Sequence, residues 1–205
     1  MSHPSPSGGL GIAPVQEERS SPYVPAKQLD SKYPLIDNDP HFTRVLRYAR
    51  PSDYGWGAAL TAAGPAVMLF WERMSPSYVG KGGFASIMRL TGAIAVGGGF
   101  LFYYQRSIQR FYGLTENRRE IDLDMREMVD KVKKGEPLYG HSSLSEHMQG
   151  VAARNSRYSG LFLYAIPWFN FVNHPFHGVD TSKYYRQAER ELAAEESGRE
   201  GPTPA

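Results

Sequence analysis

The stretch YGWGAALTAAGPAVMLFWERM, residues 54–74, decides which fold class the sequence predicts. It begins with 18 uncharged residues, and a helix of that length would span roughly 27 Å at about 1.5 Å per residue. This is the short end of the ~17–25 residues that cross a hydrocarbon core of about 30 Å. Tyr54, Trp56 and Trp71 flank the stretch as interfacial aromatic residues do, and membrane helices tolerate a residue such as Pro65. We therefore predict a first membrane-spanning helix over 54–74.

A second apolar stretch, FASIMRLTGAIAVGGGFLFYYQ, occupies residues 84–105 after a polar loop at 75–83. Its one charged residue, Arg89, is close enough to the start of the helix to snorkel to the headgroups. Two weakly apolar spans joined by a short loop predict a membrane hairpin, and the alternative is a hairpin buried inside a soluble protein. The expected fold class is an all-α membrane protein: a two-span transmembrane helical hairpin with an extended N-terminal arm and a helical, partly irregular C-terminal region.

Small residues recur four apart in both predicted spans: Ala58, Ala62 and Ala66 in the first, and Thr91, Ala95 and Gly99 in the second. Such stripes let helices approach closely where lipid supplies no hydrophobic driving force. We expect these six residues and Arg89 to contact lipid or a partner. For Arg89 the hypothesis is an anionic lipid headgroup or a partner's carboxylate, and the alternative is snorkelling alone.

The chain before the hairpin is polar. Residues 1–40 contain seven prolines and no helical period, which predicts an extended arm that is ordered by a partner or stays disordered. Residues 41–53 predict a short basic amphipathic helix that ends at Pro51. Its apolar residues lie opposite three arginines: Arg44, Arg47 and Arg50.

The chain after the hairpin predicts a helical and aromatic extramembrane region over 106–182. Asn117 and Glu120 have the spacing of a capping box, which starts a helix there. LFLYAIPWFNFV, residues 161–172, is too short to span and is expected to lie at an interface or against a partner. Residues 183–205 predict a polar helix followed by a disordered tail.

Motifs for catalysis or cofactor binding are weak. GKGGFA, residues 80–85, matches a loose dinucleotide pattern, but no strand precedes it and no acidic residue follows until Glu116, which favours a flexible interhelical loop. His174 and His177 have metal-ligand spacing, yet only Asp180 is a nearby third ligand, so packing histidines are the commoner explanation. We therefore predict no metal, no cofactor and no catalytic residues.

Composition restricts the function further. The chain contains no cysteine, which excludes disulfides, thiolate metal sites and iron–sulfur clusters held by thiolates. The net charge is +2 with both signs mixed, which is not the pattern of a nucleic-acid-binding surface.

Three segments carry a resemblance to a known family: residues 8–54, the hairpin, and NSRYSGLFLYAIPWFNFVNHPFHGVD at 155–180. Within the first, YPLIDNDPHFTRVLRYARPSDY at 33–54 is the most specific. The chain resembles the 21 kDa accessory subunit of mitochondrial NADH:ubiquinone oxidoreductase, complex I of the respiratory chain, from fungi.

The resemblance implies a location in the mitochondrial inner membrane and a non-catalytic role in the membrane arm of an electron-transport complex. The implied partners are other complex I subunits, the membrane-arm core subunits in particular, and phospholipids such as cardiolipin. The implied role is support of assembly and stability. The resemblance transfers no residue-level site.

Two other readings remain open from the sequence. One is a small oligomeric membrane transporter or translocase component. The lack of a paired acidic residue in either span counts against it. The other is a peripheral binding module whose hairpin is buried in its own core. Basic residues are more numerous beside the terminal ends of the spans than in the loop at 75–83, which predicts that both termini face the matrix.

Overall fold

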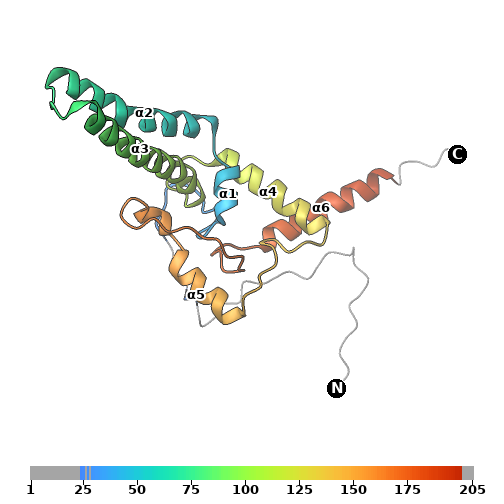
Figure 1. The fold of residues 1–205 in the computed structure, drawn as a ribbon. Helices are drawn as coiled ribbons and strands as arrows, with labels where there is room; N and C mark the ends of the chain where they lie inside the picture. The colour runs from blue at the N-terminus through green and yellow to red at the C-terminus, as the bar shows by residue number, and fades with distance from the viewer. Residues whose placement is uncertain (1–23, 26, 28, 200–205) are drawn as a thin grey trace.

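The computed structural model describes residues 24–25, 27 and 29–199, and helices are the only regular elements in these ranges (Figure 1). The all-α prediction is therefore confirmed for the described residues. The elements in chain order are α1 (Phe42–Arg47), α2 (Pro51–Met74), α3 (Gly80–Phe111), α4 (Arg118–Lys133), α5 (Glu146–Ser156), the 3-10 helix η1 (Ser159–Phe162) and α6 (Ser182–Arg199). The arm before residue 24 and the tail after residue 199 lie outside the described residues.

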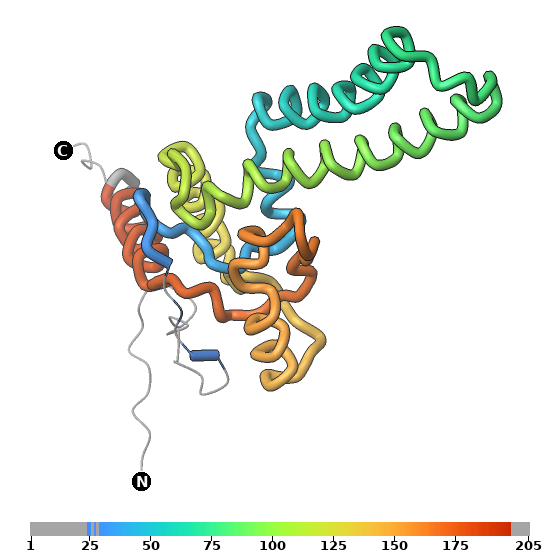
Figure 2. The backbone as a smooth tube through the Cα atoms, turned by 90° about the vertical axis from the view of Figure 1, so that its left-hand side faces the viewer, coloured from blue at the N-terminus to red at the C-terminus, as the bar shows by residue number. Residues whose placement is uncertain are grey.

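Two long helices, α2 and α3, lie side by side and project as a hairpin from a body made by the other elements (Figures 1 and 2).

The helix predicted over 41–53 is shorter than expected, since α1 ends at Arg47 and Pro51 begins α2 instead of ending α1. Proline suits the first position of a helix because its missing N–H would have no partner there. At the other end, α3 runs past the predicted limit of 105 to Phe111, because its last turns pack inside the body.

The two hairpin helices differ in hydropathy. Among the described helices, only α3 is long and apolar enough to cross a membrane, with a mean hydropathy of 1.4 over its most apolar 18 residues. α2 falls short because its apolar run also contains glycine, proline, tyrosine and tryptophan residues, which lower its mean hydropathy. The helical hairpin is thus confirmed, whereas hydropathy supports only one of its two predicted spans.

The body encloses the C-terminal part of α3. The main apolar cluster joins the segment before α1, α1 itself, the end of α3 and the region around η1. Its most deeply buried members are Ile36, Val45, Tyr48, Tyr104, Ile108, Phe111, Tyr112, Tyr158 and Leu163. Ile36 and the following residues 37–39 are buried. The last part of the predicted N-terminal arm is therefore ordered by this chain itself.

A second apolar cluster joins α4 to α6, where Met128, Val132, Tyr184 and Ala188 are buried. α4 begins after Asn117, as the sequence predicts, but the expected capping box is absent. The side chain of Asn117 instead donates to the carbonyl oxygens of Pro34 and Arg110, at 2.8 Å each. It therefore ties the start of α4 to the end of α3 and to the segment before α1.

The centre of the body is a buried arginine. Arg44, expected on the polar face of its helix, is only 6% exposed. Its guanidinium pairs with Asp37 at 3.1 Å and with Asp124 of α4, and it lies over the ring of Phe111 of α3. Burial alone would raise the pKa of Glu127, which also faces this arginine, but the positive charge outweighs burial and the pKa falls to about 2. One cation therefore connects three separate parts of the chain.

A second charged cluster fixes the base of the hairpin. The carboxylate of Asp53, in the first turn of α2, is fully buried and pairs with Arg110 at 2.6 Å and with Arg106 at 3.1 Å, both on α3. The same carboxylate accepts the backbone N–H of Arg50 at 2.8 Å, so it also caps α2. Arg50 in turn pairs with Glu120 of α4 at 2.5 Å. The orientation of the hairpin relative to the body is set by these ion pairs.

Asp53→Asn should strongly destabilise the chain, because it leaves the buried guanidinium of Arg110 without a counter-charge. Breaking a buried pair in this way costs about 3–5 kcal/mol. For a chain of this size, that lowers the thermal unfolding midpoint by at least about 6 °C. The measurement is thermal unfolding of the purified full chain in mild detergent, followed by circular dichroism.

Asp180→Asn is the matched control, since Asp180 also accepts a backbone N–H, from Ser182, and also pairs with an arginine, Arg186. Both members of that pair are more than 60% exposed. An exposed pair contributes about 0–1 kcal/mol, and asparagine caps helices as well as aspartate does. Equal midpoints for the two variants would show that the buried cluster at Asp53 does not hold the hairpin in place.

Candidate partner and lipid interface

The inner seam of the hairpin is built from glycine and threonine. A Cβ atom on Gly99 of α3 would lie 2.6 Å from the carbonyl oxygen of Gly57 on α2 and would also overlap the hydroxyl of Thr61. The Thr61 hydroxyl donates to the carbonyl oxygen of Ala95 across the seam, at 3.3 Å. Nearer the tip, a Cβ on Gly64 would lie 3.3 Å from that of Ala95. These contacts bring the two backbones close together and close the space between the helices.

The two predicted small-residue stripes therefore face different surroundings. Thr91, Ala95 and Gly99 of α3 lie in the seam, covered by α2. Ala58, Ala62 and Ala66 of α2 are all exposed. The stripe that faces α3 from α2 is instead one of Gly57, Thr61 and Gly64. Contact with a partner or a lipid stays a prediction for the alanine stripe, whereas the nearest neighbours of the α3 stripe belong to α2.

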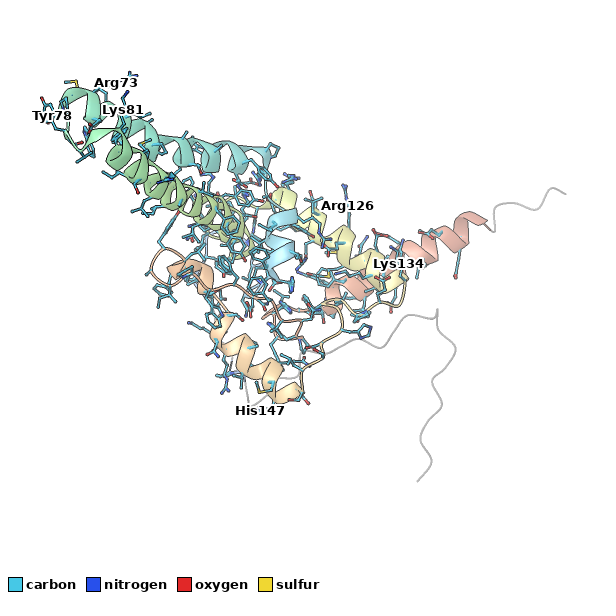
Figure 3. All side chains as sticks on the ribbon, in the orientation of Figure 1. Arg73, Tyr78, Lys81, Arg126, Lys134 and His147 are labelled. Carbon is cyan, nitrogen blue, oxygen red and sulfur yellow. The ribbon has the colours of Figure 1, made fainter. Side chains whose placement is uncertain are left out.

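The outer surface of the hairpin is apolar over most of its length. Its exposed large side chains are Tyr54, Trp56, Leu60, Val67, Leu69, Phe70, Trp71, Met74, Ile87, Leu90, Ile94, Val96 and Phe100. Arg89 is exposed among them, and none of the ion pairs between described residues includes it. Figure 3 shows that Arg73, Tyr78 and Lys81 lie at the tip, so charge is found at the two ends of the hairpin and at Arg89.

The histidine pair that has metal-ligand spacing is held by hydrogen bonds to two carboxylates. His174 Nε2 lies 2.9 Å from a carboxylate oxygen of Asp39, and His177 Nδ1 lies 2.7 Å from one of Asp37. Asp180, the candidate third ligand, is exposed. Within the described residues, no group of three or more histidines, cysteines or carboxylates is arranged to hold a metal ion. The two pairs attach the region around 174–177 to the segment before α1.

The glycine-rich pattern at 80–85 begins α3 and is not a flexible loop. An irregular connection precedes it, and the described residues contain no strand. A dinucleotide site needs a strand that leads into a phosphate-binding turn. The pattern is therefore the first turns of a candidate membrane helix, where the small residues lie in open surroundings or near Val79.

A cavity of about 270 Å³ opens on the body beside α1 and α4. Arg47 and Lys131 line it, and both approach Glu127, at 3.6 Å and 3.0 Å respectively. Because Asp37 and Glu127 line the cavity together with Arg44, Arg47 and Lys131, its wall is polar and carries charges of both signs.

None of the site residues predicted from the sequence joins the hairpin to the body; Asp53, Arg106 and Arg110 do. A signal was present: Arg106 and Arg110 are four apart, which puts them on one face of a helix. Asp53 follows Arg50 by three residues at a helix start, where an acidic side chain can cap the backbone. Neither pattern reveals that the two helix ends meet, because that depends on where the hairpin turns.

Gly99→Ala should weaken the hairpin, because the added methyl group meets backbone atoms that cannot rotate away. Overpacking of this kind costs typically about 1–3 kcal/mol. The expected result is a lower thermal unfolding midpoint for the full chain in mild detergent.

Gly97→Ala on the same helix is its control, since a Cβ there has nothing within 4 Å. Alanine is the better helix former by about 0.5–1 kcal/mol, so this variant should be neutral or slightly stabilised. A Gly99→Ala midpoint at or above that of Gly97→Ala would contradict the close approach at Gly99.

Comparison with known proteins covers nearly the whole chain. Residues 30–116 match the family described as NADH-ubiquinone oxidoreductase complex I, 21 kDa subunit. Residues 125–201 match the C-terminal family of the same 21 kDa subunit. The chain is 63% identical over 181 residues to the NADH-ubiquinone oxidoreductase 20.9 kDa subunit of Neurospora crassa, covering 88% of this chain and 96% of that relative. The chain therefore belongs to the family of the 21 kDa subunit of NADH-ubiquinone oxidoreductase complex I.

Proposed function

We propose that this chain is a non-catalytic accessory subunit in the membrane arm of mitochondrial complex I. Its role is to support assembly and stability by packing the hairpin against core membrane subunits and phospholipids. The observation that carries the proposal is the exposure of α3: only 6% of its most apolar window is buried inside the chain. An apolar helix of this length needs a cover of lipid or protein, because so large an exposed apolar surface marks an interaction site.

The pairing of the buried aspartates with basic residues of the same chain supports a structural role. Asp37, Asp39, Asp53 and Asp124 are buried, and each pairs with a histidine or an arginine of the same chain. These contacts hold elements together, and Asp37, which also lines the cavity beside α1 and α4, is engaged by both Arg44 and His177. The chemistry of the complex then belongs to other subunits.

The alanine stripe is the proposed contact for a partner helix. Ala58, Ala62 and Ala66 form a narrow strip of small side chains on the face of α2 away from the seam. Small residues in this spacing let a second helix approach closely in a membrane. Arg89 is proposed to bind the headgroup of an anionic phospholipid such as cardiolipin, since it is exposed on α3.

The alternative, a small oligomeric transporter, gains no support from the hairpin. The contact of Gly57 with Gly99 and the hydrogen bond of Thr61 close the seam. A solute path would need a space between these helices or between several copies of them.

The double substitution Ala58→Leu with Ala62→Leu tests the proposed contact. We expect the tagged wild-type chain to migrate with the very large NADH-oxidising band on a native gel of mildly solubilised mitochondrial membranes. The double variant should be largely lost from that band, because leucine fills the strip that admits a partner helix. Its unfolding midpoint should match the wild type, since both positions face away from α3. A double variant that enters the band in full amount would exclude the alanine stripe as a contact, and a wild-type chain that migrates alone would exclude the accessory role.

We further propose that the hairpin crosses the membrane with both termini on the matrix side. More arginines lie on the body side than at the tip, which favours this orientation. Because the chain contains no cysteine, single variants give clean labelling. In mitoplasts, an impermeant maleimide should label Ser77→Cys at the tip and leave Ser143→Cys on the body unlabelled. The reverse pattern would invert the orientation.

A further inference from the structure

We propose that residues 162–171, here called the aromatic loop, insert into the lipid headgroup region beside the hairpin and anchor the body against the membrane surface. The proposal rests on the membrane crossing of α3. It adds a second membrane contact, made by a segment that is too short to span and lies outside the hairpin.

Several large apolar side chains of the aromatic loop are exposed, because no other part of the body covers them. Phe162 is 67% exposed, Ile166 is 66% exposed and Trp168 is 51% exposed. The loop contains no charged residue, and none occurs between Arg157 and His174. A run of exposed apolar and aromatic side chains of this kind marks an interaction surface.

The loop is nevertheless firmly held at both ends. At its start, η1 packs against α3: the backbone N–H of Gly160 donates to the Tyr112 hydroxyl at 3.2 Å, and Leu163 is fully buried. At its end, Phe169 packs against α3 through the ring of Tyr104, with ring centroids 4.9 Å apart. The exposed side chains therefore belong to a segment whose two ends are held against α3.

The position of the loop along α3 identifies its partner. Phe169 lies against Phe100 and Tyr104, the residues at which the predicted span ends. Other aromatic residues lie at this level: Phe42 of α1 contacts Phe100 with ring centroids 6.3 Å apart, and Tyr54 of α2 packs on Tyr103 of α3 with centroids 4.8 Å apart. Aromatic side chains concentrate at the boundary between hydrocarbon and headgroups. The aromatic loop adds further aromatic side chains at the same level, beside the hairpin.

Figures 1 and 2 show this arrangement: the loop, drawn in orange, lies on the side of the body that adjoins the base of the hairpin. α5 leads into the loop, and its start, marked by His147 in Figure 3, lies at the end of the body away from the hairpin. A lipid surface that surrounds α3 at the level of Phe100 therefore adjoins the loop, whereas the start of α5 lies farther from it. The occupant that fits an apolar surface at this depth is phospholipid, with its headgroup and the first part of its acyl chains.

The test is photocrosslinking in the assembled complex, in mitochondrial membranes. The photoreactive residue p-benzoyl-phenylalanine replaces Phe162 or Ile166 of the full tagged chain, one at a time. After irradiation and denaturing purification, we expect both variants to gain the mass of one phospholipid. Leu90, exposed in the middle of α3, is the positive control, and Met148, an exposed apolar residue of α5, is the negative control.

The outcomes separate this inference from the proposed function. A lipid adduct at Leu90 together with a protein adduct, or no adduct, at both loop positions overturns the anchor and leaves the span intact. Lipid adducts at Met148 as strong as those at Ile166 would also overturn the anchor, since the contact would not be specific to the loop. The absence of any adduct at Leu90, to lipid or to a membrane subunit, would refute the membrane crossing itself, and the anchor with it.

Discussion

The buried guanidinium of Arg44 is the interaction on which the rest of the structure depends. It pairs with Asp37 before α1 and with Asp124 on α4, and it lies over the ring of Phe111 at the end of α3. Asp124 also accepts the hydroxyl of Tyr184 on α6. A buried charge costs several kcal/mol unless its partners are complete, so these elements are stable together only in an arrangement that supplies both carboxylates to the arginine.

The body built around Arg44 determines the position and orientation of the hairpin. The end of α3 is enclosed in the body, and Asp53 joins the start of α2 to Arg106 and Arg110 beside it. Gly57 and Gly99 then bring the two helices into backbone contact. The hairpin is therefore held at its base by charge and along its seam by small residues, which leaves its outer apolar surface for the surroundings. This fixed base and uncovered surface support the proposed packing of the chain against larger membrane partners.

The elements that the sequence predicted well are those with a strong local signal. Long uncharged runs around a short polar loop predicted the hairpin, and the amphipathic stripe after Asn117 predicted α4. The errors came from patterns with two local explanations. Pro51 can end one helix or begin the next, and Arg44 has the helical spacing of a solvated face although its carboxylate partners lie elsewhere in the chain. Spacing predicts the alanine stripe of α2, but it does not show that Gly57, Thr61 and Gly64 are the residues that meet α3.

The sequence by itself determined that the chain is helical, that its centre is an apolar hairpin and that it resembles the complex I family, because these properties follow from composition, periodicity and the order of residues. Only the tertiary structure decided which residues close the seam, which charges are buried and which aromatic side chains remain exposed at the base of α3. Those depend on contacts between residues far apart in the chain, such as Asp53 with Arg110 and Phe100 with Phe169. No local pattern encodes such a contact, since it exists only once the hairpin has turned and the body has formed around it.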